Sequence, residues 1–289
     1  MNISVINNFK DNFDTLILPV SKNRKINSHN KELDKKINKY IELYSFSYSD
    51  DKFLSFDLEA DNKLKQIVLV NIDLPDKLQI RDTLFNVFGK ISEKSKNILF
   101  INSDLFFDEY IITEIFILRY YKFIKYIENS KKHKHHLFIL TNKDIDLTET
   151  IELANSVNTA RDLVNEPSNV LYPETLAESA LSLGEKYGFE VEVLNKKDIK
   201  KLKMECFLKV GEGSDKEQKL IILRYHGNKK DKNKIGLIGK GVTFDSGGLS
   251  LKPSDSMIEM KSDMAGAAAV SSAVCTASNM KIKKHIIGV

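Results

Sequence analysis

The first half of the chain alternates short runs of β-branched and aliphatic residues with segments of helical periodicity. This alternation is typical of α/β folds, in which helices cover a largely parallel or mixed sheet. We therefore predict the α/β fold class. The segments predicted as strands are Thr15–Val20, Gln66–Ile72, Asn97–Asn102 and Leu137–Thr141.

Two helices are predicted between these strands. The first presents one apolar face, and the second is a longer helix over Asp108–Ile127 with an aromatic flank. The apolar face of the first helix consists of Ile80, Leu84, Val87, Phe88 and Ile91.

The pattern changes near residue 148. Thr148–Asn165 predicts an amphipathic helix that ends before Pro167, because a proline disfavours helical backbone in the residue before it. Pro173 suits the first position of a second helix. A strand over 189–194, a short basic helix near Asp198, and strands over 219–225 and 234–239 are predicted next. The buried candidates of the 148–165 helix are Ile151, Leu153, Ala154, Val157, Ala160, Leu163 and Val164.

A chain of 289 residues fits two ordinary domains, which we place at residues 1–147 and 148–289. Hydrophobic residues make up 42% and charged residues 29%, a composition that excludes disorder and collagen-like repeats. The net charge of +4 is too small to indicate nucleic acid or a membrane surface as a partner. No apolar stretch reaches spanning length, and the N-terminus shows no signal peptide. Cys206 and Cys275 form no CxxC motif, so we expect a reducing, cytoplasmic location.

Two polar runs have simple interpretations. The run KKHKHH at 131–136 could hold a transition metal, but no nearby carboxylate or cysteine completes a ligand set. A solvated loop before a strand is the favoured interpretation. The run KKDKNK at 229–234 separates two strand-like segments and predicts the polar tip of a hairpin or a similar loop. The three histidines of the first run are His133, His135 and His136.

Chemically informative residues gather in KGVTFDSGGLSLKP at 240–253 and MKSDMAGAAAV at 260–270. A strand leads into a glycine-rich turn, and an alanine-rich helix follows, so charged groups converge at strand and helix ends, where α/β proteins place their sites. Two carboxylates suit a hard or borderline divalent cation, and a lysine can join them only as a neutral amine. The converging residues are Lys240, Asp245, Lys252 and Asp263, around the turn at Gly247 and Gly248.

Taken one at a time, these residues have ordinary explanations. A single aspartate at a helix start is usually an N-cap, a single lysine usually faces solvent, and a glycine pair usually marks a turn. Nucleotide binding is also disfavoured. Only two residues separate Gly236 from Gly239, which excludes a P-loop, and GKGVTF lacks the last glycine of a GxGxxG pattern.

Residues 240–270 closely resemble the signature region of the leucine (cytosol) aminopeptidase family, which are dinuclear metallopeptidases that remove N-terminal residues from peptides. The segments ARDLVNEPSNVLYP (160–173) and FLKVGEGS (207–214) are similar to that family too. The resemblance implies an N-terminal α/β domain joined by a helix to a mixed-sheet α/β catalytic domain, which is incomplete in this chain.

The resemblance also implies roles for five residues. Lys240 and Asp245 would be metal ligands, and Asp263 would bind the second, more exchangeable metal. Lys252 would contact the substrate carbonyl and stabilise the tetrahedral intermediate, and Met260 would line the pocket for the N-terminal side chain. Two adjacent cations can deprotonate a bridging water and polarise the carbonyl, while a fixed positive charge stabilises the oxyanion.

The resemblance implies two divalent ions (Mn²⁺ or Zn²⁺), peptide substrates with leucine-like N-terminal residues, and a homo-hexamer. The family's second signature block, which supplies a further aspartate and glutamate and an arginine that holds bicarbonate as general base, does not occur in this sequence. We therefore expect this chain by itself to be inactive and to bind metal poorly.

Two other functions remain open at this point. One is a non-catalytic binding or regulatory protein on the same scaffold, for example a DNA-binding one, to which the charge of +4 gives no special support. The other is a generic α/β ligand-binding module in residues 1–147, where no motif discriminates among ligands.

Overall fold

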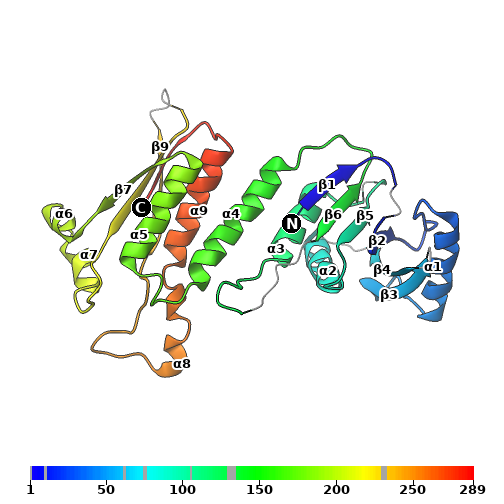
Figure 1. Ribbon diagram of the computed structural model, residues 1–289, viewed down its shortest axis with the longest axis horizontal. Helices are drawn as coiled ribbons and strands as arrows, with labels where there is room; N and C mark the ends of the chain where they lie inside the picture. Colours follow the sequence, from blue (N-terminus) through cyan, green and yellow to red (C-terminus); the bar gives the residue numbers. More distant parts are fainter. Residues whose placement is uncertain are drawn as a thin grey trace. The chain divides into compact units, whose positions relative to one another are not determined.

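The computed structural model of the chain divides into two compact units, Met1–Ile151 and Glu152–Val289 (Figure 1). Each unit is a mixed α/β structure with its own sheet. No helix in the described part of the chain is long and apolar enough to cross a membrane. The structure describes residues 2–9, 12–60, 63–73, 77–104, 106–128, 135–228 and 233–289.

The N-terminal unit is built on a six-stranded sheet with the order β1-β6-β5-β2-β4-β3. All neighbouring strands are parallel except β3 and β4, which pair antiparallel. The predicted α/β class with a largely parallel sheet is therefore confirmed. The strands are β1 (Asn2–Ile6), β2 (Thr15–Val20), β3 (Phe53–Ala60), β4 (Lys63–Asn71), β5 (Asn97–Ile101) and β6 (His136–Leu140).

Helices cover both faces of this sheet. Leu16 of β2 shares a buried cluster with Ile37 of α1, on one face. On the other face, the Phe88 ring of α2 lies 6.4 Å from Phe100 of β5 and 5.3 Å from Phe116 of α3, centroid to centroid. Successive side chains of a strand point to opposite faces, so one sheet anchors both helical layers. The helices are α1 (Lys31–Leu43), α2 (Lys77–Gly89) and α3 (Glu109–Arg119).

The predicted helix over Asp108–Ile127 is wrong in its C-terminal part, because α3 ends at Arg119. Asp108 is the N-cap, and its carboxylate accepts a hydrogen bond from the Tyr110 N–H at 2.8 Å. The Tyr120 hydroxyl donates to the carbonyl oxygen of Phe88 at 2.8 Å. This contact with α2 fixes Tyr120 just after the helix end. Tyr120 therefore packs against α2 rather than extending α3.

The C-terminal unit contains a four-stranded mixed sheet with the order β7-β8-β10-β9. Strand β10 is antiparallel to β8 and parallel to β9. The hairpin alternative for the run at 229–234 is therefore wrong, since β10 lies between the two strands that this run connects. The other alternative, a similar loop, stays a prediction, because residues 229–232 lie outside the described part. The strands are β7 (Glu190–Leu194), β8 (Leu220–His226), β9 (Lys234–Leu237) and β10 (His285–Gly288).

Two helices pack on one face of this sheet and run alongside each other in Figure 1. Ala180 of α5 and Val274 of α9 share a buried cluster with Leu223 of β8 and Ile286 of β10. The small residues of α9 allow this close packing. The helices of the unit are α4 (Thr148–Asn165), α5 (Pro173–Tyr187), α6 (Lys196–Lys201), α7 (Glu205–Val210), α8 (Ser254–Met257) and α9 (Ala265–Asn279), with a 3₁₀ turn at Met260–Ser262.

Helix α4 has the predicted bounds but a narrower buried face than predicted. Ala154 is fully buried, whereas Leu153 and Val157 are 46% and 39% exposed. Leu163 and Val164 pack against the cluster around Met264 at the start of α9. Leu153 and Val157 are one helical turn apart, on a face of α4 other than the buried one. The sequence periodicity therefore predicted more buried residues in α4 than the structure shows.

Candidate functional site

The end of strand β9 is joined to the start of helix α9 by a close approach of their backbones. A Cβ atom at Gly239 would lie 2.4 Å from the carbonyl oxygen of Gly266, and one at Gly266 would lie 2.7 Å from the Lys240 backbone nitrogen. The Ala267 N–H donates to the Lys240 carbonyl oxygen at 2.9 Å. Only glycine fits at both contact points, and this contact fixes the backbone of Lys240 beside α9.

The Lys240 and Asp263 side chains meet beside this contact between the two backbones. Lys240 Nζ lies 2.6 Å from Asp263 Oδ1. Asp263 follows the 3₁₀ turn, and its N–H donates to the carbonyl oxygen of Met260 at 3.3 Å. The Asp263 side chain is only 16% exposed, and its Oδ2 is buried without a hydrogen-bond partner among the described residues. A buried carboxylate oxygen without a donor is costly, which makes this atom a candidate ligand for a cation.

A tight turn after β9 brings Asp245 and Lys252 together. Gly247 has φ +90°, and a Cβ atom there would lie 2.4 Å from the Ser250 carbonyl oxygen. The Lys252 N–H donates to the Ser246 carbonyl oxygen at 2.9 Å, which closes the turn. Lys252 Nζ then lies 2.8 Å from Asp245 Oδ2. Gly247 was predicted to mark a turn, and the left-handed backbone at this position requires a glycine.

Asp245 is held in its ionised form. The Lys252 ammonium and the Gly247 N–H, which donates to Asp245 Oδ1 at 2.9 Å, lower the pKa of this carboxyl. The charge of Lys240 contributes in the same direction.

Met260 lies beside the second pair. Its Sδ atom is 3.0 Å from Lys252 Nζ, a contact with a weak acceptor. The structure thus brings Lys252 and Met260 together, as it does Lys240 with Asp263 and Lys252 with Asp245. The roles assigned to these five residues stay predictions.

Sequence reasoning missed three residues that position this site. Gly239 and Gly266 permit the contact between β9 and α9, and the signal for both was a glycine next to a charged or alanine-rich segment. Lys261 Nζ donates to the Asn165 carbonyl oxygen at the end of α4, at 2.9 Å, and so anchors the 3₁₀ turn. No sequence signal distinguishes Lys261 from a surface lysine.

The donor set fits a divalent cation. It offers the carboxylates of Asp245 and Asp263 and the side chain of Lys240, which donates to Asp263, with a buried, unpartnered oxygen on Asp263. No group of three or more His, Cys, Asp or Glu side chains in the described ranges is placed to hold a metal ion. A metal centre here would therefore need Lys240 as a third ligand, in the form of a neutral amine in place of its ion pair with Asp263.

The described histidines of the run at 131–136 contribute no such group. His135 is 2% exposed and its Nδ1 donates to the Ser95 carbonyl oxygen at 2.5 Å, whereas His136 Nε2 lies 2.8 Å from the Ser4 hydroxyl. His133 lies outside the described residues. The two described imidazoles thus have structural contacts at the start of β6.

Comparison with known proteins places the site in a family context. Residues 158–289 match the model of the cytosol aminopeptidase family, catalytic domain. The chain is 34% identical over 296 residues to a "Probable cytosol aminopeptidase" of Fusobacterium nucleatum, covering 99% of this chain and 61% of that protein. It is also 34% identical to one of Clostridium perfringens, covering 96% and 60%. The chain therefore spans about three fifths of these relatives' length.

Solved structures share the fold. A leucine aminopeptidase mutant from tomato superposes with a TM-score of 0.79 at 23% identity, covering 100% of this chain and 61% of that one. The bottromycin maturation enzyme BotP in complex with Mn superposes with a TM-score of 0.77 at 22% identity, covering 95% and 58%. These likenesses establish a common α/β architecture.

Proposed function

Because the chain belongs to the cytosol aminopeptidase family through residues 158–289, we propose that its function is that of a metal-dependent aminopeptidase. Such an enzyme releases leucine-like N-terminal residues from peptides. The observation that carries the proposal is the corner where Lys240 meets Asp263 and Lys252 meets Asp245. The named relatives are cytosol aminopeptidases, which supports the same reaction.

Lys240, Asp245 and Asp263 would hold two divalent cations, Mn²⁺ or Zn²⁺. The unpartnered Asp263 Oδ2 and the ionised Asp245 support this assignment, and the BotP structure, which is a complex with Mn, is consistent with it. When bound, such ions supply Lewis-acid polarisation of a peptide carbonyl and an activated water.

Lys252 would stabilise the developing oxyanion of the substrate. Its ammonium is anchored by Asp245 at 2.8 Å and its side chain is 28% exposed, so it is a fixed positive charge that a substrate can still reach. Met260 lies against this ammonium and offers an apolar surface to the N-terminal side chain. Such a surface favours aliphatic residues modestly, since each methylene discriminates by about 1–3 kcal/mol.

The three donors are too few for two cations, each of which takes four or more ligands. We therefore propose that residues 1–289 alone bind metal weakly and hydrolyse no peptide. The bicarbonate implied by the family resemblance has no assigned residue in this chain and enters no step.

Location, assembly and domains follow as proposals. The relatives' names support a cytosolic protein, and the family resemblance supports a hexamer. We also retain the division into an N-terminal α/β domain at residues 1–147 and part of a catalytic domain at 148–289.

Direct metal binding tests the proposed centre. Mn²⁺ binding to the purified chain, followed by electron paramagnetic resonance, should be weak but measurable, and Asp263→Asn should abolish it. Asp255→Asn removes an exposed carboxylate from nearby α8 and should leave binding unchanged. Equal binding by both variants would remove Lys240, Asp245 and Asp263 as the metal site. Release of leucine from a leucyl amide by this chain with Mn²⁺ would contradict the proposed inactivity.

A further inference from the structure

The N-terminal unit has a topological switch point at its sheet. Strands β2 and β5 are parallel neighbours. The chain leaves β2 toward α1, on one face, and leaves β5 toward α3, on the opposite face. In open parallel sheets, the crevice between two loops that diverge in this way, at the carboxyl ends of the strands, is the usual ligand site.

A pocket lies at this point. Its walls include Val20 and Ile101, the aliphatic ends of β2 and β5. The loops that leave these strands supply its polar lining, which is dominated by hydrogen-bond donors. These polar residues are Ser21, Arg24, Lys25, Asn27, His29 and Ser103, together with the carboxylate of Asp104.

The positive charge of Arg24 in the pocket is only weakly neutralised by a neighbouring carboxylate. The Arg24 guanidinium lies 3.7 Å from the Asp104 carboxylate, and the two side chains are 58% and 54% exposed. The same guanidinium lies over the Phe106 ring, 4.6 Å from its centroid. An exposed ion pair of this length contributes little, so an anion could replace Asp104 while the aromatic contact holds Arg24 in place.

His29 joins the two diverging loops across the crevice. Its Nε2 lies 3.0 Å from the Ser103 hydroxyl on the β5 side. Its backbone has φ +62°, an uncommon conformation for a residue with a side chain. This conformation is maintained although it costs free energy, and strained residues of this kind concentrate at binding sites.

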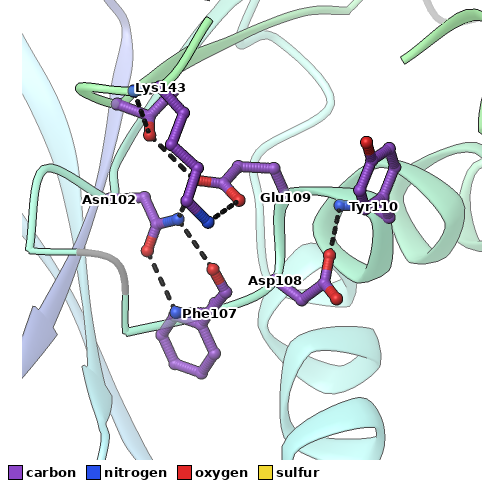
Figure 2. A network of polar contacts seen from close by, with 7 residues as sticks. Asn102, Phe107, Asp108, Glu109, Tyr110 and Lys143 are labelled. Carbon is purple, nitrogen blue, oxygen red and sulfur yellow. Dashed lines mark hydrogen bonds and ion pairs between the residues drawn. The ribbon is translucent and has the colours of Figure 1, made fainter. Parts of the chain in front are cut away.

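Both loops are held by buried or multiple hydrogen bonds. Ser21 and the Lys22 N–H donate to the two carboxylate oxygens of Asp73, at 2.8 and 3.0 Å. On the β5 side, Asn102 exchanges hydrogen bonds with the Phe107 backbone at 2.8 and 3.1 Å, as Figure 2 shows, and Glu109 accepts from Asn102 at 3.0 Å. The pocket walls are therefore preorganised rather than formed by free loops.

We propose that this crevice binds a small phosphate-bearing molecule. A phosphate offers several acceptor oxygens and at least one negative charge, which match the guanidinium, ammonium and amide donors of the lining. The Ser21 hydroxyl already donates to Asp73, and the Ser103 hydroxyl pairs with His29. This inference concerns the N-terminal unit and is independent of the aminopeptidase proposal.

Isothermal titration calorimetry of the full chain tests the site with inorganic phosphate, adenosine monophosphate and adenosine. Both phosphate-containing probes should bind, and adenosine should not. The double variant R24A/K25A should weaken binding at least about tenfold, because two charge-assisted contacts are lost. The matched variant K35A/K39A removes the same charge from the exposed face of α1 and should bind as the wild type does.

Three results would overturn the site. They are absence of phosphate binding at millimolar concentration, equal binding of adenosine and its monophosphate, and equal weakening in both double variants. The last result would show that the overall charge, and not the pocket, attracts the anion. Arg24 and Lys25 are exposed, so the double variant should fold as the wild type does, and circular dichroism checks this directly.

Discussion

The Ala267 N–H donates to the carbonyl oxygen of Lys240 at 2.9 Å, which ties the first turn of α9 to the end of β9. This bond forms only because Gly239 and Gly266 let the two backbones touch. The side chain of Lys240 then lies against Asp263, 2.6 Å from its Oδ1. The candidate centre therefore depends on backbone packing before it depends on any charged group.

Substituting Gly239 should disrupt this contact. In Gly239→Ala the new Cβ would meet the Gly266 carbonyl oxygen at 2.4 Å, so β9 and α9 must separate. We expect a loss of about 1–3 kcal/mol in the free energy of unfolding, measured by urea denaturation. Gly236→Ala is the matched control, because nothing lies within 4 Å of a Cβ at that position of β9. Equal stability of the two variants would contradict the proposed role of the contact.

The buried carboxylate of Glu109 should make the N-terminal unit sensitive to acid. Its side chain is 1% exposed and accepts a hydrogen bond from Thr141 at 2.8 Å. It also accepts one from Lys143 at 3.1 Å (Figure 2). Burial would raise the pKa of Glu109, but the bonds from Thr141 and its own backbone and the contact with Lys143 outweigh it, so the pKa is below the ordinary 4.5. The resulting stability is present above pH 4.5 and is lost as pH falls through the lowered pKa.

The variant Glu109→Gln tests the direction of this pH dependence of stability. At pH 7 it should be less stable than the wild type by about 1–3 kcal/mol, because bonds to a charged group are lost. The difference should shrink below pH 4.5 in urea unfolding followed by circular dichroism. Glu114 lies on the same helix as Glu109 and pairs with Arg81 of α2, where both side chains are partly exposed, so Glu114→Gln should cost under about 1 kcal/mol. If the difference in free energy of unfolding between the wild type and Glu109→Gln grew as pH fell, the predicted direction of the pKa shift of Glu109 would be wrong.

The sequence predicts the fold where one local signal decides the structure. The run Asn97–Asn102 is β-branched and aliphatic, and it forms β5 almost as expected. Strand β3 (Phe53–Ala60) escaped notice because its polar alternation suits an antiparallel edge, not the continuous apolar runs of the parallel strands. The end of α3 was missed because Tyr120 is fixed by a tertiary bond to Phe88, which no local pattern reports.

In the candidate site too, features set by one residue were predictable, whereas features set by tertiary packing were not. The turn at Gly247 was predictable, because glycine is the residue that adopts φ +90° without strain. The position of β10 between β8 and β9 was not predictable, since strand order is set by packing of the sheet against α5 and α9. The contact of Lys240 with Asp263 depends on this order and on the Gly239–Gly266 approach.

The two cysteines should differ sharply in reactivity. Cys206 is exposed, whereas Cys275 is 1% exposed in the cluster between α5, α9 and the sheet. Burial raises the pKa of the Cys275 thiol to about 12, with Lys186 opposing slightly. Since the thiolate is the reactive form, Ellman's reagent at pH 8 should modify one thiol in the native chain and both in guanidinium. In Cys206→Ser the native chain should show none, and rapid modification there would place Cys275 at the surface.

The aromatic stack between α2, β5 and α3 should carry much of the stability of the N-terminal unit. Phe88 is fully buried between Phe100 and Phe116, whereas Phe85, on the same helix, is 46% exposed. Phe88→Ala should lower the free energy of unfolding by about 3–5 kcal/mol, because a cavity replaces the ring. Phe85→Ala loses a cation–π contact with Arg119 at a half-exposed position and should cost under about 1 kcal/mol. Urea denaturation distinguishes them, and similar losses in both variants would mean that the buried stack is not what holds α2 and α3 on the sheet.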